Sequence, residues 1–109
     1  MSATWSVVAD GNGNETTKQC DHLTEIHDVT PDSTEGCGDC LREGTRWVHL
    51  RECLVCGHIG CCDNSPRKHA TAHWHATDHA VMHSAEPGET WAWCYPDNLF
   101  LGQETAGER

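Results

Sequence analysis

Two Cys-x2-Cys pairs in the first half of the chain have the spacing of metal ligands. They are Cys37 with Cys40 and Cys53 with Cys56. Such a turn directs two thiolates at one ion, and structural Zn²⁺ is bound by four Cys or His ligands in a tetrahedron. A thioredoxin-like redox motif needs a βαβ context, which the surrounding sequence lacks. The two pairs therefore predict zinc sites.

The stretch CCDNSPRKHATAHWHATDH, residues 61–79, follows the second pair and supplies further ligands. Its two cysteines are Cys61 and Cys62, and its four histidines are at positions 69, 73, 75 and 79. His69 and His73 are i,i+4 neighbours on one face of an expected helix, so they could share an ion or be divided between two. The spacing alone leaves this assignment open.

A looser group of ligands joins the two ends of the Cys- and His-rich region. Cys20 and His22 form a Cys-x-His segment, and Cys94 with Asp97 has the spacing of a Cys-x2-Cys pair whose last member is a carboxylate. Asp is a legitimate zinc ligand. The alternative is that these side chains pack or face solvent without a metal.

The composition indicates a single small domain that needs a cross-link in addition to its hydrophobic core. The chain has 109 residues, of which 37% are hydrophobic, a figure that includes eight Cys. Small folds with a thin core add disulfides or a structural metal. The N-terminal residues lack an export signal, so we expect a cytoplasmic protein. Thiols stay reduced in that compartment, and a structural metal is therefore favoured over disulfides.

The charge and the hydropathy pattern exclude two classes of partner. The net charge is −10, with 17 acidic against 7 basic side chains. Such a surface repels phosphate backbones, so we expect no nucleic-acid partner. No apolar run reaches the roughly 18 residues that would span a bilayer, and we expect no membrane partner.

Periodicity and turn residues predict an α+β fold: a small, zinc-stabilised antiparallel sheet packed against one main helix. Ser65 as N-cap and Pro66 at the first helical position predict a helix from 66 to about 76. Alternation and turn signals predict strands at 45–52, near 57–61, at 79–86, at 90–97 and at 98–101. We expect residues 1–19 to be a flexible segment, 20–101 the folded domain and 102–109 a tail.

The order CDH, CGDC, CLVCGHIGC, HATAH, a further His and WAWCY resembles the UBP-type zinc finger of ubiquitin-specific proteases and of a cytoplasmic histone deacetylase. The resemblance covers about residues 20–101 and is strongest to stand-alone bacterial members. It implies cross-braced ligand sets, with Cys37, Cys40, Cys61 and His69 on one ion and Cys53, Cys56, His73 and His79 on another. It places Cys20, His22, Cys94 and Asp97 on a third ion, although Asp97 departs from the family's pattern. Cys62 stands where Gly is usual, as a free thiol or as the ligand in place of Cys61.

The resemblance also implies a binding function. Family members bind the C-terminal Gly-Gly tail of ubiquitin in an aromatic pocket, to which Trp93, Tyr95 and Trp47 correspond by position. The family's Arg that grips the chain terminus is replaced by Asp63. We therefore expect a protein-interaction module for a peptide or protein C-terminal tail, ubiquitin-like or other, with a neutral or positive terminus.

Enzymatic function is not expected, because the sequence lacks H-E-x-x-H and deaminase motifs and each expected ion already has four protein ligands. Two alternatives remain beside the interaction module. The dense Cys and His content is compatible with a zinc-buffering or zinc-donor protein. A labile third site with Asp97 is the only place where a hydrolase centre could lie.

Overall fold

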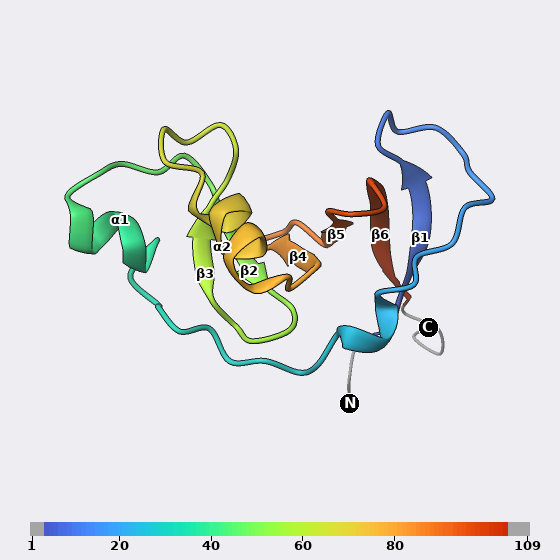
Figure 1. Cartoon of the computed structure of the whole chain (residues 1–109), viewed down its shortest axis with the longest axis horizontal. Helices are drawn as coiled ribbons and strands as arrows, with labels where there is room; N and C mark the ends of the chain where they lie inside the picture. Colours follow the sequence, from blue (N-terminus) through green and yellow to red (C-terminus); the bar gives the residue numbers. More distant parts are fainter. Residues whose placement is uncertain (1–3, 105–109) are drawn as a thin grey trace.

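The computed structural model describes residues 4–104 and is built on a six-stranded antiparallel sheet (Figure 1). The strand order is β1-β6-β5-β4-β2-β3. The strands are β1 (Thr4–Asp10), β2 (Leu50–Cys53), β3 (Ile59–Cys61), β4 (Val81–Ser84), β5 (Trp91–Cys94) and β6 (Leu99–Glu104). The helices are the 3-10 turn η1 (Leu23–Glu25), the short α1 (Gly38–Glu43) and the main helix α2 (His69–Thr77). The predicted α+β class is confirmed.

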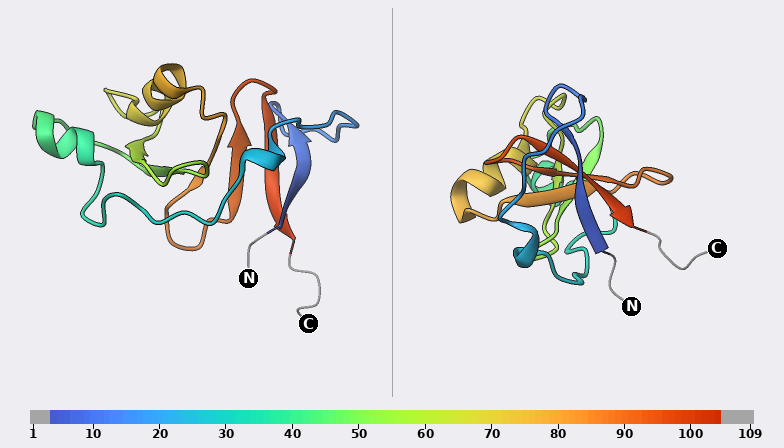
Figure 2. Two further views of the ribbon diagram at one scale, coloured as in Figure 1. Left: turned by 60° about the horizontal axis from the view of Figure 1, so that its bottom comes forward. Right: turned by 90° about the vertical axis from the view of Figure 1, so that its right-hand side faces the viewer.

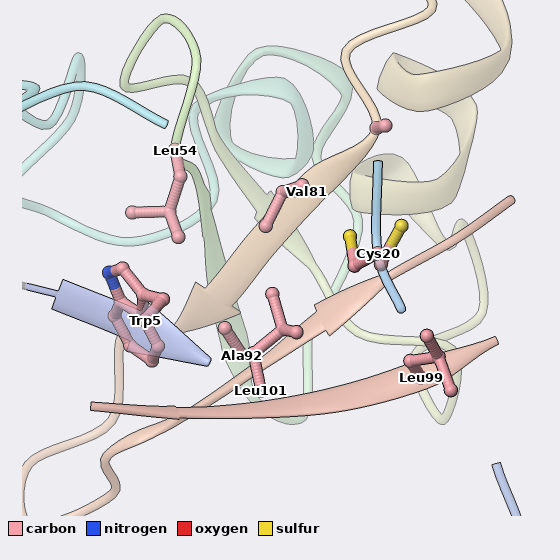
Figure 3. Close-up of a cluster of buried hydrophobic side chains, with 9 residues drawn as sticks. Trp5, Cys20, Leu54, Val81, Ala92, Leu99 and Leu101 are labelled. Atoms are coloured by element: carbon pink, nitrogen blue, oxygen red, sulfur yellow. The ribbon is translucent and has the colours of Figure 1, made fainter. Parts of the chain in front are cut away.

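The two faces of the sheet have different roles, because successive strand residues point to opposite sides. One face is covered by α2 and carries the cross-strand neighbours Met82, Trp93 and Phe100. The other face carries the buried core, to which Val81, Ala92, Leu99 and Leu101 contribute together with Trp5, Leu54 and Cys20 (Figure 3). Since the core occupies the opposite face, the side chains between α2 and the sheet are available to line a binding site.

The N-terminal segment differs from the expectation of a flexible region. Residues 4–10 form β1, which pairs antiparallel with β6, and the two strands lie side by side at one end of the molecule (Figures 1 and 2). Trp5 is only 8% exposed and packs into the core, with Val7 against it. The reason is that β6 offers an open edge of hydrogen-bonding groups, which β1 covers. The tail was expected from residue 102, but β6 continues to Glu104. Residues 1–3 and 105–109 lie outside the described part of the chain.

The main helix begins three residues later than predicted, at His69 rather than Pro66. Ser65 does not cap it; its buried hydroxyl instead accepts a hydrogen bond from the N–H of Val48 at 2.8 Å. Lys68 precedes the helix in a left-handed conformation, and the N–H of His69 donates to Cys61 Sγ at 3.2 Å. A cysteine sulfur thus takes the first free N–H of the helix, where a side-chain oxygen was expected.

Close packing fixes α2 against β3 at one glycine. A Cβ atom at Gly60 would lie 2.7 Å from the backbone nitrogen of Ala70, so only glycine fits there. This contact holds the start of α2 next to the end of β3. It brings His69 beside Cys61, as the first metal group requires.

The predicted strand over 45–52 is shorter than expected and begins only at Leu50. The sequence pattern also missed α1, a six-residue helix that begins directly after Cys37. The sulfur of Cys37 accepts the N–H of Cys40 at 3.4 Å, and Gly44 ends the helix with a φ of 75°. The first Cys-x2-Cys turn is therefore the N-terminus of a helix.

Candidate metal centres and aromatic cavity

The first group of metal-ligating side chains is completely interior. Cys37 and Cys40 come from the start of α1, Cys61 from the end of β3 and His69 from the start of α2, and all four are buried. His69 Nδ1 lies 3.4 Å from Cys37 Sγ, 3.4 Å from Cys40 Sγ and 3.5 Å from Cys61 Sγ, and the sulfurs of Cys40 and Cys61 are 3.8 Å apart. Tetrahedral zinc with ordinary bond lengths separates two sulfurs by about 3.8 Å and a sulfur from a nitrogen by about 3.5 Å. The donor atoms therefore have the spacing that a Zn²⁺ ion needs.

A carboxylate orients the histidine of the first group. His69 Nε2 lies 3.2 Å from each carboxylate oxygen of Glu43, and Arg67 holds Glu43 from outside at 3.2 Å. A metal-bound His usually donates its other N–H to such an acceptor, which fixes the tautomer and the ring plane. Glu43 therefore keeps Nδ1 of His69 directed at the three sulfurs.

The second group has the same spacing but is more open to solvent. It contains Cys53 from the end of β2, Cys56 from the β2–β3 connection, His73 from α2 and His79 from the loop after α2. Cys53 Sγ lies 3.6 Å from His79 Nδ1, and Cys56 Sγ lies 3.4 Å from His73 Nε2. The two ligating nitrogens are 3.3 Å apart, as expected for two nitrogens at about 2.0–2.1 Å from a tetrahedral ion. Cys53 is buried whereas Cys56 is exposed.

His58 supports the second group, a role that the sequence did not reveal. Its ring stacks on His73 with centroids 4.5 Å apart. Its two nitrogens contact Asp32 at 2.7 Å and Asp39 at 2.9 Å. The imidazole therefore joins α1 and the loop before it to the ring of a metal ligand.

The third group joins segments that are far apart in sequence. Cys20 and His22 meet Cys94 and Asp97 beside the core face of the sheet. His22 Nδ1 lies 3.0 Å from Asp97 Oδ2, and Cys94 Sγ lies 3.3 Å from each of these two atoms. Four donor atoms of suitable chemistry converge here too, in slightly tighter spacing than in the first group. The carboxylate of Asp97 thus occupies the position of a fourth ligand.

The cysteine thiols in these groups resist deprotonation unless a cation is bound. Burial raises the pKa of Cys37 to about 12 and the pKa of Cys53 to about 11, and it raises the pKa of Cys94 further still. Zinc binds thiolates and displaces their protons. A doubly charged cation is the physical reason for collecting buried cysteines in this way.

An aromatic cavity of about 620 Å³ lies between α2 and the sheet. Trp74 of α2 stacks on Tyr95, with centroids 4.6 Å apart and planes 7° apart. Trp93 meets Phe100 edge to face at 4.8 Å on the sheet side. Burial raises the pKa of Tyr95 to about 12, so its hydroxyl stays protonated. The full lining is Arg51, Cys62, Asp63, Asn64, Ala70, Thr71, Trp74, Met82, Trp91, Trp93, Tyr95, Pro96, Asn98 and Phe100.

Comparison with known proteins decides the family. The profile of a family described as "Zn-finger in ubiquitin-hydrolases and other protein" matches residues 37–106. The chain belongs to this zinc-finger family. As a zinc finger with three Cys- and His-rich groups, it has Zn²⁺ as its cofactor.

A solved structure of similar fold is that of protein RPA1320 from Rhodopseudomonas palustris, determined in solution by NMR. It is 49% identical to this zinc finger, has a TM-score of 0.71, and the match covers 80% of this chain and 84% of that chain. No curated protein matches the sequence. In residues 4–104, no helix is long and apolar enough to cross a membrane.

The ligand sets implied by the resemblance agree with the geometry of the zinc finger. The structure brings the twelve side chains together in the same three groups of four. His69 and His73 point to different groups, although they are neighbours on one helix. Cys62 stays outside the first group, where its sulfur lies 3.6 Å from the hydroxyl of Ser65. The geometry therefore favours Cys61 over Cys62 as the ligand.

The residues expected in the pocket of the zinc finger need one correction. Trp93, Tyr95 and Asp63 line the cavity, whereas Trp47 does not. Trp47 precedes β2 and packs against the first metal group, so close to Gly36 that a Cβ there would lie 2.3 Å from its ring. The prediction failed because strand β2 starts only at Leu50. The β2 residue that faces the cavity is Arg51.

Most of the cavity lining was not identified from the sequence, and its largest missed side chains include Arg51, Trp74 and Trp91. The available signal was the strand alternation that places Trp91 on the same face as Trp93, and the helical spacing of 70, 71 and 74. The guanidinium of Arg51 lies 4.7 Å over the ring of Trp91. Asp63 lies at the exposed rim, where its carboxylate accepts the hydroxyl of Thr71 at 2.6 Å.

Proposed function

We propose that the chain is a protein-interaction module, in which structural zinc ions hold an aromatic cavity that binds the C-terminal tail of a peptide or protein. The observation that carries the proposal is the cavity between α2 and the sheet, with aromatic walls from both. Binding pockets have volumes of about 300–1,000 Å³ and combine apolar walls with a few polar groups. A ubiquitin-like tail is one candidate ligand.

The metal groups and the cavity are coupled through shared elements. Helix α2 supplies His69 and His73 to two groups and Trp74 to the cavity. Strand β5 supplies Trp91 and Trp93 to the cavity and Cys94 to the third group. In this proposal the zinc ions hold the aromatic rings in place, so that the cavity is formed before the ligand binds.

A catalytic role for the zinc ions is not part of the proposal. A catalytic zinc keeps an open coordination position for water or substrate, whereas a structural zinc is closed by four protein ligands. Each of the three groups offers four donor atoms. In this proposal Asp97 is the fourth donor of the third group, so a zinc ion there has no open position for a water molecule.

Titration of the zinc-loaded chain with a panel of C-terminal tail peptides, followed by NMR shifts of the tryptophan indole N–H groups, tests the proposal. We expect Trp74→Ala to weaken binding at least about tenfold, because it removes one ring of the stacked pair. Leu41→Ala is the control, since Leu41 is 51% exposed and lies outside the cavity lining. Equal affinity of wild type and Trp74→Ala, or no binding of any peptide, would overturn the proposal.

One observation favours zinc exchange as a second candidate function. Cys56 of the second group is exposed, whereas all four side chains of the first group are buried. A zinc donor needs an accessible, weakly held ion. Competition with a fluorescent chelator measures this: release of one ion at micromolar chelator supports donation, and retention of every ion contradicts it.

A further inference from the structure

Arg51 is a half-buried cation that makes no direct ion pair with a carboxylate in residues 4–104, although the chain is strongly acidic. The chain has 17 acidic and 7 basic side chains. Even so, among the side chains that the structure describes, no carboxylate lies within ion-pair distance of the Arg51 guanidinium. Removing a charge from water without a partner is unfavourable. The compensation available to Arg51 is indirect: the hydroxyl of Ser84 donates to Glu89 and lowers the pKa of that carboxylate, and the charge of Arg51 helps to lower it. A cation without a direct carboxylate contact in an aromatic cavity points to an anionic ligand group.

The position of the guanidinium is fixed by contacts along one side. Its Nη1 donates to the carbonyl of Leu50 at 3.0 Å and to the hydroxyl of Ser84 at 3.4 Å. Its Cζ lies over the ring of Trp91, 4.7 Å from the ring centroid. A guanidinium has five N–H donors, and those on Nε and Nη2 have no acceptor among the described residues. A preorganised fork of donors is therefore left for a ligand.

The charge of the cavity fits one carboxylate better than a phosphate. Arg51 is the only basic residue in the lining. A phosphate group carries close to two negative charges and is usually held by several donors or cations, whereas a single Arg fork matches the two oxygens of one carboxylate. Asp63 at the rim adds a negative charge, which disfavours a second anionic group on the ligand.

We propose that Arg51 is the anion-binding residue of this cavity, and that the ligand presents one carboxylate to it with a neutral or basic residue near Asp63. The inference rests on the proposed peptide-binding function and defines the chemistry of its ligand. It also revises the expectation drawn from Asp63 alone, which predicted a neutral or positive terminus. The positive charge for a carboxylate comes from strand β2 and not from position 63.

Three forms of one probe peptide test the charge and its source. They are acetyl-Lys-Leu-Gly-Gly as the free acid, the same peptide as the C-terminal amide, and acetyl-Lys-Leu-Gly-Glu amide, whose only carboxylate is a side chain. We expect wild type to bind the free acid roughly 10- to 100-fold more tightly than the Gly-Gly amide, which is the effect of a charged hydrogen-bonded pair. If the Glu amide binds like the free acid, a side-chain carboxylate suffices; if it binds like the Gly-Gly amide, a chain terminus is required.

Arg51→Gln should bind the free acid and the amide with equal affinity, near that of wild type for the amide. Arg46→Gln is the matched control, because it removes the same charge from an exposed side chain outside the cavity and should leave the wild-type ratio unchanged. Native mass spectrometry of each variant confirms its zinc content. If Arg51→Gln does not fold, Arg51→Lys keeps the charge without the fork, and its acid-to-amide ratio should be at least about threefold lower than that of wild type.

The outcomes separate the two proposals. Binding of both peptide forms with equal affinity by wild type overturns the role of Arg51 and leaves the peptide-binding function standing. An unchanged ratio in the Arg51 variants also overturns that role. Failure of every form to bind overturns the proposed function and this inference together.

Discussion

The adjacent cysteines Cys61 and Cys62 allow a sharp test of the first metal group, because the same substitution should have a large effect at one position and a small effect at the other. The sulfur of Cys61 lies 3.5 Å from His69 Nδ1 and 3.8 Å from Cys40 Sγ, and it accepts the His69 N–H at 3.2 Å. Cys62 is also buried, at 5% exposure, but the side-chain hydrogen-bond partner of its sulfur among the described residues is the Ser65 hydroxyl, at 3.6 Å. One thiol is a ligand in this geometry and its neighbour is not.

The expected magnitudes differ widely. A structural zinc contributes about 10–16 kcal/mol of apparent binding free energy in small peptides, whereas the net stability of a whole domain is only about 5–15 kcal/mol. Cys61→Ser should therefore cost most or all of the free energy of unfolding and release at least one zinc ion. Cys62→Ser exchanges a buried thiol for a hydroxyl that can still bond to Ser65, so we expect a loss of about 1 kcal/mol or less.

Native mass spectrometry and thermal unfolding of both variants, prepared in parallel, measure these effects. We expect Cys62→Ser to keep the wild-type zinc count and to lower Tm by no more than about 4–8 °C, the shift that corresponds to 1 kcal/mol in a domain of this size. Cys61→Ser should lose zinc and its cooperative transition. The reasoning is refuted if Cys62→Ser loses zinc while Cys61→Ser keeps it, or if both keep the full count.

Three further predictions test other parts of the zinc finger. Asp97→Ala should reduce the zinc count by one and Asp97→Cys should restore it, as native mass spectrometry can show; an unchanged count in the Ala variant would remove Asp97 from the ligands. Glu43→Gln should weaken zinc binding of the first group about 10- to 100-fold in chelator competition, because it weakens the support of His69 Nε2, and Arg67→Gln should have a smaller effect. Gly60→Ala should cost about 1–3 kcal/mol in chemical unfolding, because its Cβ would lie 2.7 Å from Ala70 N, whereas Gly38→Ala, with its nearest contact at 3.5 Å, should not destabilise the fold. Equal stability of the two alanine variants would contradict the close packing of α2 on β3.

Some features of the fold followed from local patterns and others did not. The sequence pattern around WAWC and VMHS predicted β5 and β4, which pair with each other in the sheet, because successive strand residues face opposite sides. The Ser-Pro start signal at 65 and 66 failed, because the helix begins where His69 meets Cys61 and not where local capping is best. Strand β1 was missed because its stability comes from β6, almost a hundred residues later in the chain.

The sequence alone determined the family and the two Cys-x2-Cys pairs as candidate zinc ligands, because ligand spacing in a short turn is a local property that tertiary packing does not alter. Only the tertiary structure separated Cys61 from Cys62, moved Trp47 away from the cavity and put Arg51 into it. Those outcomes depend on where β2 begins and on how closely α2 approaches β3, and strand register decides which side chain faces which side of a sheet. The spacing of Cys and His residues therefore indicates metal binding, whereas the register of the strands decides which side chains line the cavity.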